Sequence, residues 1–312
     1  MKITKNIEIL QNFTIKNIPN LDIAVLGALE LFMNVKLPKL SIQFKKPLVV
    51  GSGNAAVTGK VLFADKDVIL SDESNYLEKL INIAGIDGAI LISASGSKHA
   101  IPISRELKKR GVKTILLTNS DNAPAKRFID KENLFVFPKN REPYTYNAST
   151  YMGIIFGKTH EDPEHIYNFI TKKTAKEISK DFNKYDAYYL LIPEQFSAMS
   201  EMFMTKFDEM FQPIISGRVF TAEQSKHAKS VVKNDQELFI SFGYENKTFG
   251  LAKNRLNITL PKNVDYAGFM AIVYYVLGKV QESYPPYFQK GIVNYCKNAS
   301  KIFGYEIKPI VE

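Results

Sequence analysis

Residues 87–98 read Asp-Gly-Ala-Ile-Leu-Ile-Ser-Ala-Ser-Gly-Ser-Lys, a short apolar segment that runs directly into a loop rich in hydroxyl groups. An amphipathic segment at 98–110 and a second apolar segment at 113–118 follow it. This order is typical of a strand, a helix and a strand in a parallel sheet. Hydroxyl groups between the end of a strand and the start of a helix favour an anion, because unpaired backbone N–H groups and the helix dipole attract negative charge. The stretch therefore predicts a phosphate-binding loop.

The same alternation extends through the first half of the chain. Strands are expected at 48–51, 67–71, 87–93, 113–118 and 134–137, and most of them are too apolar to keep one face in water. Such strands form a mainly parallel sheet with helices on both faces, and ligands bind beyond their carboxyl ends. The expected helices lie at 22–34, 54–63, 74–83, 98–110, 123–127, 146–157 and 162–172, after a short irregular start.

The second half repeats this pattern after a polar connector at 171–184. The sequence thus predicts an α/β protein of two three-layer α/β/α sandwiches, each with a mainly parallel, flavodoxin-like sheet. One sandwich would comprise residues 1–178 with a leading helix, and the other residues 179–312 with a C-terminal helix and a tail. That tail lacks a helical period and is expected to lie on another part of the chain. The expected strands are 186–192, 213–217, 237–241 and 255–259, and the helices are 194–211, 221–230, 264–282 and a last one to about residue 302.

Composition narrows the class of protein. The chain has 312 residues and a formal charge of +9, with its basic residues scattered, which favours anionic small molecules over nucleic acid. Cys296 is the single cysteine and the four histidines lack zinc-ligand spacing, so we expect no disulfide, no metal and a reducing, cytoplasmic setting. No apolar run approaches the ~20 residues that span a membrane. Gly51-Ser52-Gly53 lacks the rest of a dinucleotide fingerprint, so we expect no organic cofactor.

Three loops of the first half resemble those of the sugar isomerase (SIS) domain. They are Gly51-Ser52-Gly53-Asn54 after the first strand, Ser93-Ala94-Ser95-Gly96 after the third, and Asn147-Ala148-Ser149-Thr150 after the fifth. In that family the serine-rich loops hold the phosphate of a sugar phosphate. The resemblance therefore implies a phosphate site, and the residues assigned to it are Ser52, Gly53, Asn54, Ser93, Ser95, Gly96, Lys98 and Ser149.

This chain departs from the family pattern within that site. Asn54-Ala55 stands where many members carry a serine, and Lys98-His99 stands where a threonine usually opens the helix. Lys98 either adds a charge-assisted contact to the phosphate or points into water. His99 is interpreted as a surface or packing residue.

The second half is similar to the isomerase part of glucosamine-6-phosphate synthase and to archaeal bifunctional phosphoglucose/phosphomannose isomerases. Those enzymes carry a glutamate at the end of a helix, a histidine one strand later and a lysine near the C-terminus. Glu209, His227 and Lys308 match these positions, although Ala228 replaces the glycine that usually follows the histidine. The resemblance implies that Glu209 shuttles a proton between two sugar carbons, that His227 assists ring opening and that Lys308 closes over the sugar.

Judged by their spacing in the sequence alone, these three residues would be surface side chains without a part in catalysis. Glu209 lies off the centre of the apolar stripe of its helix, which by itself predicts a solvated side chain. His227 lies in a polar segment, and terminal lysines such as Lys308 usually serve solubility. Glu223 is an alternative base, because a shift of the alignment would bring it to the same place.

The sequence therefore favours an aldose–ketose isomerase for a phosphorylated hexose or aminohexose, which works through an enediol. Two alternatives stay open: a sugar-phosphate-binding protein without catalysis, and a deglycase or deaminase of amino-sugar phosphates. Paired SIS enzymes commonly dimerise, so the resemblance also implies a homodimer. Neither a nucleic acid nor a membrane is expected as a partner.

Overall fold

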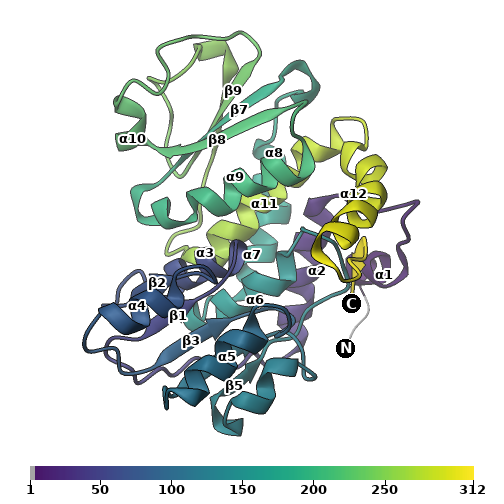
Figure 1. Ribbon diagram of the computed structural model, residues 1–312. Helices are drawn as coiled ribbons and strands as arrows, with labels where there is room; N and C mark the ends of the chain where they lie inside the picture. The colour runs from purple at the N-terminus through teal and green to yellow at the C-terminus, as the bar shows by residue number, and fades with distance from the viewer. Residues whose placement is uncertain (1–3) are drawn as a thin grey trace. The chain divides into compact units, whose positions relative to one another are not determined.

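The computed structural model describes residues 4–312, which form two compact units (Figure 1). The five-stranded unit holds Val35–Lys139 and Thr150–His160. The four-stranded unit holds the described residues up to Asn34, Asn140–Ser149 and Glu161–Glu312. The leading helices therefore pack with the second sheet. The division expected at residues 178/179 stays a prediction.

The sheet of the five-stranded unit has the strand order β2-β1-β3-β4-β5, with every pair parallel. Its strands are β1 (Leu48–Val50), β2 (Ile69–Ser71), β3 (Ala89–Ile92), β4 (Thr114–Thr118) and β5 (Leu134–Val136). This is the flavodoxin-like order, and it confirms the predicted class of sheet. The chain winds outward in opposite directions from the β1–β3 pair, so the loops after these strands diverge and leave room for a ligand.

Helices cover this sheet because its strands are apolar on both faces. On one face Leu48 and Leu91 pack against Ile103 and Leu107 of the helix that follows β3. On the other face Gly59 brings a helix so close that a Cβ would lie 2.7 Å from Val49. The helices are α3 (Asn54–Leu62), α4 (Tyr76–Asn82), α5 (Ala100–Lys109) and α6 (Ala148–Thr159), with short 3₁₀ turns at Pro124–Phe128 and Lys131–Asn133.

The four-stranded sheet repeats the topology of the first, with the order β10-β9-β7-β8 and every pair parallel. Its strands are β7 (Ala187–Ile192), β8 (Ser216–Thr221), β9 (Glu237–Phe242) and β10 (Arg255–Ile258). In both sheets the second strand along the chain lies at one edge, next to the first strand. The third strand lies on the other side of the first, and the later strands follow it outward. The predicted α/β architecture of two SIS-like sandwiches is therefore confirmed.

Alternation along β7 decides what covers the faces of this sheet. Tyr188 stacks on Phe207 of the helix α9 (Ser200–Met210), with ring centroids 5.8 Å apart. Tyr189 points to the other face and stacks on Phe239 at 4.6 Å. Helix α11 (Tyr266–Glu282) joins α9 beside the first face, whereas the second carries the short α10 (Ala222–Lys226) and loops.

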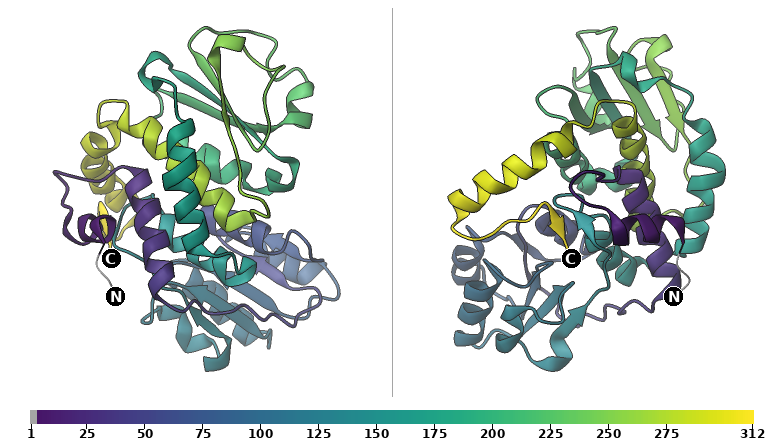
Figure 2. Two further views of the ribbon diagram at one scale, coloured as in Figure 1. Left: turned by 180° about the vertical axis from the view of Figure 1, so that it is seen from behind. Right: turned by 90° about the vertical axis from the view of Figure 1, so that its right-hand side faces the viewer.

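Further helices complete the four-stranded unit (Figure 2). Helix α2 (Leu21–Asn34) crosses α11 in close contact, because Gly278 lets the backbone of Asp22 approach. Asp22 then pairs with Lys279 at 2.8 Å in a largely buried site. The remaining helices are α1 (Lys5–Asn12), α7 (Pro163–Phe169), a π-helical turn at Ile170–Thr174, α8 (Ala175–Glu177), α12 (Tyr287–Phe303), and 3₁₀ turns at Phe182–Lys184, Glu194–Met199 and Ala252–Asn254.

The structure corrects three expected elements. The start of the chain was expected to be irregular, but Thr4 caps the helix α1 by accepting a hydrogen bond from the amide of Ile7. The strand expected at 213–217 begins only at Ser216, because the turn at Pro213 precedes it. The helix expected at 221–230 ends at Lys226, since Ala228 adopts a left-handed φ of +59°.

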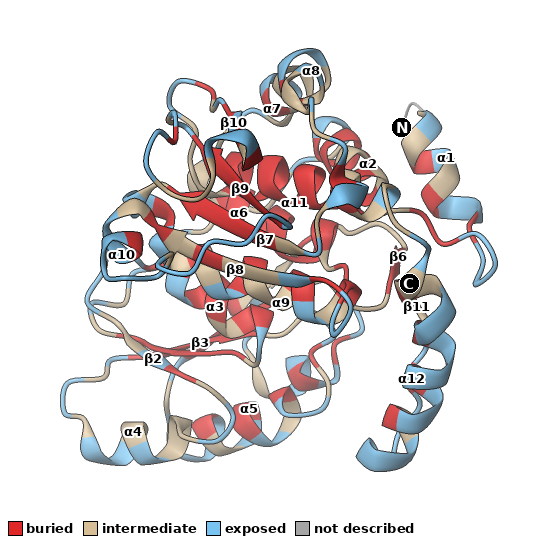
Figure 3. Cartoon of the chain, turned by 90° about the horizontal axis from the view of Figure 1, so that it is seen from above, coloured by how far each residue is buried: buried red, intermediate tan, exposed pale blue. Residues whose placement is uncertain are grey.

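The C-terminal tail lies on another segment, as its sequence predicted. Strand β11 (Ile310–Val311) pairs antiparallel with β6 (Glu142–Pro143), and both belong to the four-stranded unit. Figure 3 shows this two-stranded ribbon beside α12, whose outer face is exposed. The tail is therefore fixed at its end by main-chain hydrogen bonds.

The crossing of α2 and α11 generates a test of stability. A Cβ at residue 278 would lie 2.0 Å from the amide nitrogen of Asp22, so Gly278→Ala should destabilise the protein by about 1–3 kcal/mol. Gly291→Ala in α12 meets no atom within 4 Å and should stabilise it by about 0.5–1 kcal/mol. Urea unfolding measures the change in the free energy of unfolding of each variant. Equal changes in the two variants would contradict the close contact between α2 and α11.

Candidate functional site

The loop after β1 is a tight turn that needs its glycines. A Cβ on Gly51 would lie 2.6 Å from backbone atoms of Ala55 and Ala56, and Gly53 has a φ of +54°. The turn leads into α3, whose first residue is the buried Asn54. Ser52 donates a hydrogen bond of 2.6 Å to Glu73. The structure therefore places Ser52, Gly53 and Asn54 together at the carboxyl end of β1.

The loop after β3 is held rigidly by the neighbouring strand. The carbonyl of Ala94 accepts hydrogen bonds from the amide of Asn119 at 2.8 Å and from the hydroxyl of Thr118 at 3.0 Å. Gly96 has a φ of +59°, and a Cβ there would lie 2.4 Å from the Cβ of Ala123. These contacts fix the backbone of the loop before any ligand binds.

The hydroxyl groups of this loop lie close together at the end of β3. The Ser95 and Ser97 Oγ atoms lie 2.6 Å apart, and Ser93 is partly exposed at the end of β3. Within residues 4–312 the amide of Ser95 donates no hydrogen bond. Because β1 and β3 are adjacent and parallel, this loop and the loop at Ser52 leave the same edge of the sheet.

Lys98 and His99 follow this loop and are both exposed. Lys98 has a left-handed φ of +47°, and His99 precedes α5 without capping it. The two alternatives for Lys98, a phosphate contact or a solvated side chain, both stay open.

Ser149 has a structural role in the four-stranded unit. It is fully buried at the start of α6, and its Oγ accepts a hydrogen bond of 2.9 Å from the amide of Asn140. Its own amide donates to the carboxylate of Glu142. A contact between Ser149 and phosphate stays a prediction.

Glu209 is paired with a lysine that the sequence reasoning missed. The Nζ of Lys206 donates to Glu209 Oε2 at 2.6 Å, one helical turn away in α9. The Lys206 side chain is 0% exposed, whereas that of Glu209 is 23% exposed. A signal was available, because Lys206 lies within the apolar stripe of the helix, between Phe203 and Phe207. A lysine at a core position implies a charged partner.

The ammonium of Lys206 is also held by groups from two positions outside its own helix. It donates to the carbonyl of Thr145 and lies 5.5 Å from the centre of the Tyr274 ring. Tyr144, next to Thr145, packs near Tyr295 with ring centroids 6.4 Å apart. Burial, with nearby phenols and Glu209, raises the pKa of Tyr144 to about 12, so this phenol keeps its proton at neutral pH.

Glu223 lies in a different environment. Its side chain is largely exposed and pairs with Lys226 at 2.5 Å within one turn of α10. Exposed pairs of this kind contribute little stability and leave the carboxylate in water. Glu209 is therefore the carboxylate with the enclosed partner, although the choice between the two as base stays a prediction.

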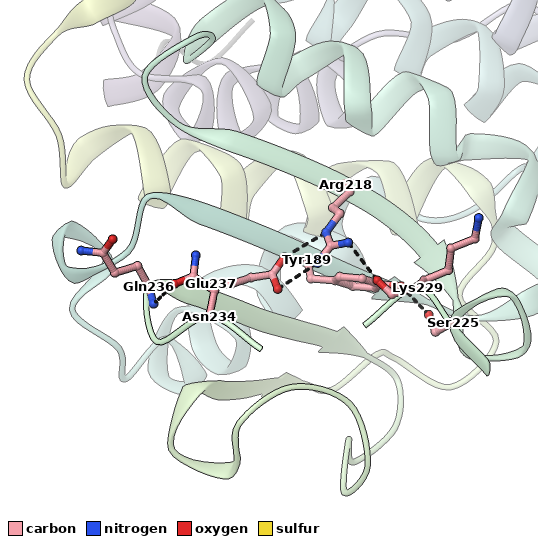
Figure 4. Close-up of polar contacts among 7 residues, drawn as sticks. All are labelled: Tyr189, Arg218, Ser225, Lys229, Asn234, Gln236 and Glu237. Atoms are coloured by element: carbon pink, nitrogen blue, oxygen red, sulfur yellow. Dashed lines mark hydrogen bonds and ion pairs between the residues drawn. The ribbon is translucent and has the colours of Figure 1, made fainter. Parts of the chain in front are cut away.

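His227 is exposed and ends α10. The segment that carries it is fixed by Arg218, which binds the buried carboxylate of Glu237 through two nitrogens and donates to the carbonyl of Lys229 at 2.8 Å (Figure 4). On the other side the hydroxyls of Tyr189 and Ser225 lie 2.8 Å apart. This network fixes the backbone on both sides of His227, whose side chain is exposed.

Lys308 lies in the tail, two residues before β11. Its side chain is 69% exposed and pairs loosely with Glu306 at 3.7 Å. The carbonyl of the next residue, Pro309, accepts a hydrogen bond of 2.8 Å from the amide of Tyr144. Within the four-stranded unit, the tail and the Lys206–Glu209 pair are thus joined through residues 144–145.

Within residues 4–312, no group of three or more histidine, cysteine, aspartate or glutamate side chains could hold a metal ion. None of the helices in this part of the chain is both long and apolar enough to cross a membrane.

No protein-family model matches the sequence, and no curated protein sequence matches it. Solved structures do resemble it. Glucosamine-6-phosphate deaminase from Thermotoga maritima superposes with a TM-score of 0.59 and 14% identity, over 90% of this chain and 94% of that chain. The C-terminal domain of glucosamine-fructose-6-phosphate aminotransferase from Francisella tularensis gives 0.58 and 14%, over 93% and 97%. Tagatose-6-phosphate ketose/aldose isomerase from Escherichia coli gives 0.58 and 12%, over 92% and 94%.

These similarities extend over nearly the whole length of each chain. The chain has the fold of SIS-type phosphosugar proteins. At 12–14% identity the similarity establishes the fold, and it leaves the reaction to be argued from the residues.

The backbone at Ala228 generates a second test. A left-handed φ costs an alanine about 1–2 kcal/mol, so Ala228→Gly should raise the free energy of unfolding by about 1 kcal/mol. Ala175→Gly is the control, because φ is −58° there and glycine should lower the free energy by about 0.5–1 kcal/mol. Thermal unfolding compares the two, and a loss of stability in Ala228→Gly would contradict the backbone conformation beside His227.

Proposed function

We propose that this protein binds a phosphorylated sugar, with the phosphate at the carboxyl edge of the five-stranded sheet. The observation that carries the proposal is the pair of hydroxyl-rich loops, after β1 and β3, at the point where the strand order reverses. The amide of Ser95, the hydroxyls of Ser93 and Ser95 and the start of α5 supply neutral donors, and Ser52 would join them by turning its hydroxyl away from Glu73. Gly53, Asn54 and Gly96 shape the two turns, and Lys98 is the candidate for a charged contact.

We further propose aldose–ketose isomerisation through an enediol. This reaction needs a base that removes a proton from one carbon and returns it to the next. Glu209 suits the role because its carboxylate is partly exposed yet fixed by the buried ammonium of Lys206. A cation beside the carboxylate also offers a counter-charge to the enediolate.

The other assigned residues complete the proposal. His227 would assist ring opening from its exposed position at the end of α10, and Lys308 would approach the sugar from the tail. Ser149 would contribute indirectly through the turn that it closes, or directly to the phosphate. A homodimer and a cytoplasmic setting belong to the same proposal. The substrate we favour is a hexose or aminohexose phosphate.

The phosphate site is tested by binding. A thermal-shift series with hexose, aminohexose and pentose phosphates should find a ligand that stabilises the protein as RT ln(1 + [L]/Kd). Ser95→Ala should weaken that ligand about 10–100-fold, because a hydrogen bond to a charged group contributes about 1.5–3 kcal/mol. The control is Ser41→Ala, an exposed hydroxyl of the same unit. The absence of stabilisation by every sugar phosphate would refute the binding site.

The acid–base role is tested by turnover. Glu209→Gln keeps the size of the side chain and removes its charge, so kcat should fall roughly 10²–10⁴-fold while sugar-phosphate affinity changes little. Glu223→Gln is the matched control and should retain turnover. Solvent deuterium incorporated at C1 or C2 of the sugar distinguishes isomerisation from deamination, which releases ammonia. If Glu223→Gln loses the activity and Glu209→Gln keeps it, the assignment of the base is wrong.

A further inference from the structure

The turn at residues 144–147, between β6 and α6, has an unusual backbone. Thr145 has a φ of +76° and Asn147 a φ of +51°. Asparagine tolerates this region, but a β-branched threonine does so only under strain. Its hydroxyl does not explain the position, because Thr145 Oγ1 is buried without a hydrogen bond among the described residues. The amide of Tyr146 donates to the carbonyl of Pro143 at 3.2 Å, so Thr145 is the third residue of a β-turn, where a type II turn requires a positive φ.

Contacts on both sides hold this turn in place. The amide of Tyr144 donates to the carbonyl of Pro309 at 2.8 Å, next to the pairing of β11 with β6. The hydroxyl of Tyr146 donates to the carbonyl of Pro19 at 2.9 Å and accepts a hydrogen bond from Gln281 at 2.8 Å. Strained conformations persist where the surroundings over-determine them, and they gather at functional sites.

In this turn the carbonyl of Thr145 accepts a hydrogen bond from the Lys206 ammonium. The same carbonyl accepts a hydrogen bond of 3.1 Å from the side chain of Asn147. Lys206 is fully buried, and its ammonium also contacts Glu209 at 2.6 Å and the face of Tyr274. The carbonyl thus fixes where the ammonium lies, and the ammonium fixes the carboxylate of Glu209.

We propose that Thr145 is a positioning residue: held by the tail strand β11, its backbone carbonyl orients Lys206 and thereby the carboxylate of Glu209. The proposal rests on the function proposed above for Glu209. On this proposal the tail does more than carry Lys308, because the pairing of β11 with β6 is needed to hold Glu209 in the position of the base. A displacement of about 1 Å at a reacting group can cost roughly 10²-fold in rate.

The test uses variants that change the backbone of residue 145. Proline fixes φ near −65°, so Thr145→Pro turns the carbonyl away from Lys206. The conservative variant Thr145→Val keeps the branched side chain and the carbonyl, and it removes only the unpaired hydroxyl. A second route leaves the turn unchanged in sequence: a chain that ends after Lys308 retains that lysine and loses β11 and the Pro309 carbonyl.

The first readout is the reactivity of Lys206 toward an acylating reagent, measured by mass spectrometry. Thr145→Pro and the shortened chain should raise the rate at Lys206 roughly tenfold or more, because the ammonium loses its fixed partner. Thr145→Val should keep Lys206 protected. Lys279, which is held by Asp22 and Glu282, serves as the internal reference and should not change. Unchanged protection of Lys206 in both altered chains would overturn the proposal.

The second readout is kinetic. Thr145→Pro should lower kcat roughly 10–100-fold and leave the affinity for a sugar phosphate unchanged. In a double-mutant cycle, Thr145→Pro should add little to Lys206→Met, since both act through one contact. Additive effects would overturn the proposal. If Lys206 becomes reactive as expected but the intact protein turns over no sugar phosphate, the proposed function fails while the positioning role stands.

Discussion

Parallel pairing of the strands is the constraint on which the rest of this structure depends. In each sheet the strand that comes first along the chain, β1 or β7, is an interior strand. The second strand pairs with it on one side and the third strand on the other. Carboxyl ends of neighbouring strands therefore meet at one edge, and their loops diverge. In the five-stranded unit those loops carry the glycines and serines at 51–53 and 93–97. The candidate phosphate site is a consequence of that topology.

The second sheet repeats the topology but carries different chemistry. After β7 the chain continues with Pro193-Glu194, and after β9 with Gly243-Tyr244, so the hydroxyl-rich loops are not repeated. Instead, this unit encloses a lysine–glutamate pair in α9 and fixes an exposed histidine segment through Arg218 and Glu237. The two sheets therefore share a topology, but the loops of the first unit carry neutral hydrogen-bond donors and the second unit carries charged groups.

Much of the fold could be predicted from the sequence, because apolar strands and amphipathic helices alternate with clear periods. The incorrect predictions concern places where one residue sets the boundary of an element. The turn at Pro213 precedes β8, the left-handed Ala228 follows the end of α10, and Thr4 caps α1. Ser149 shows the limit for site residues, since a serine at a helix start is equally suited to a phosphate and to the hydrogen bond from Asn140. The pattern of residue types is the same in both cases.

The sequence by itself determined the order of strands and helices and the placement of hydroxyl-rich loops at strand ends, because both follow from residues within one turn or one strand. Only the tertiary structure decided that Lys206 is buried against Glu209, that the tail pairs with β6, and that Thr145 is held in a left-handed conformation. The contact between Thr145 and Lys206 joins residues 61 positions apart, and the pairing of β11 with β6 joins residues still farther apart in the sequence. Their formation depends on packing among many segments, which no local pattern encodes.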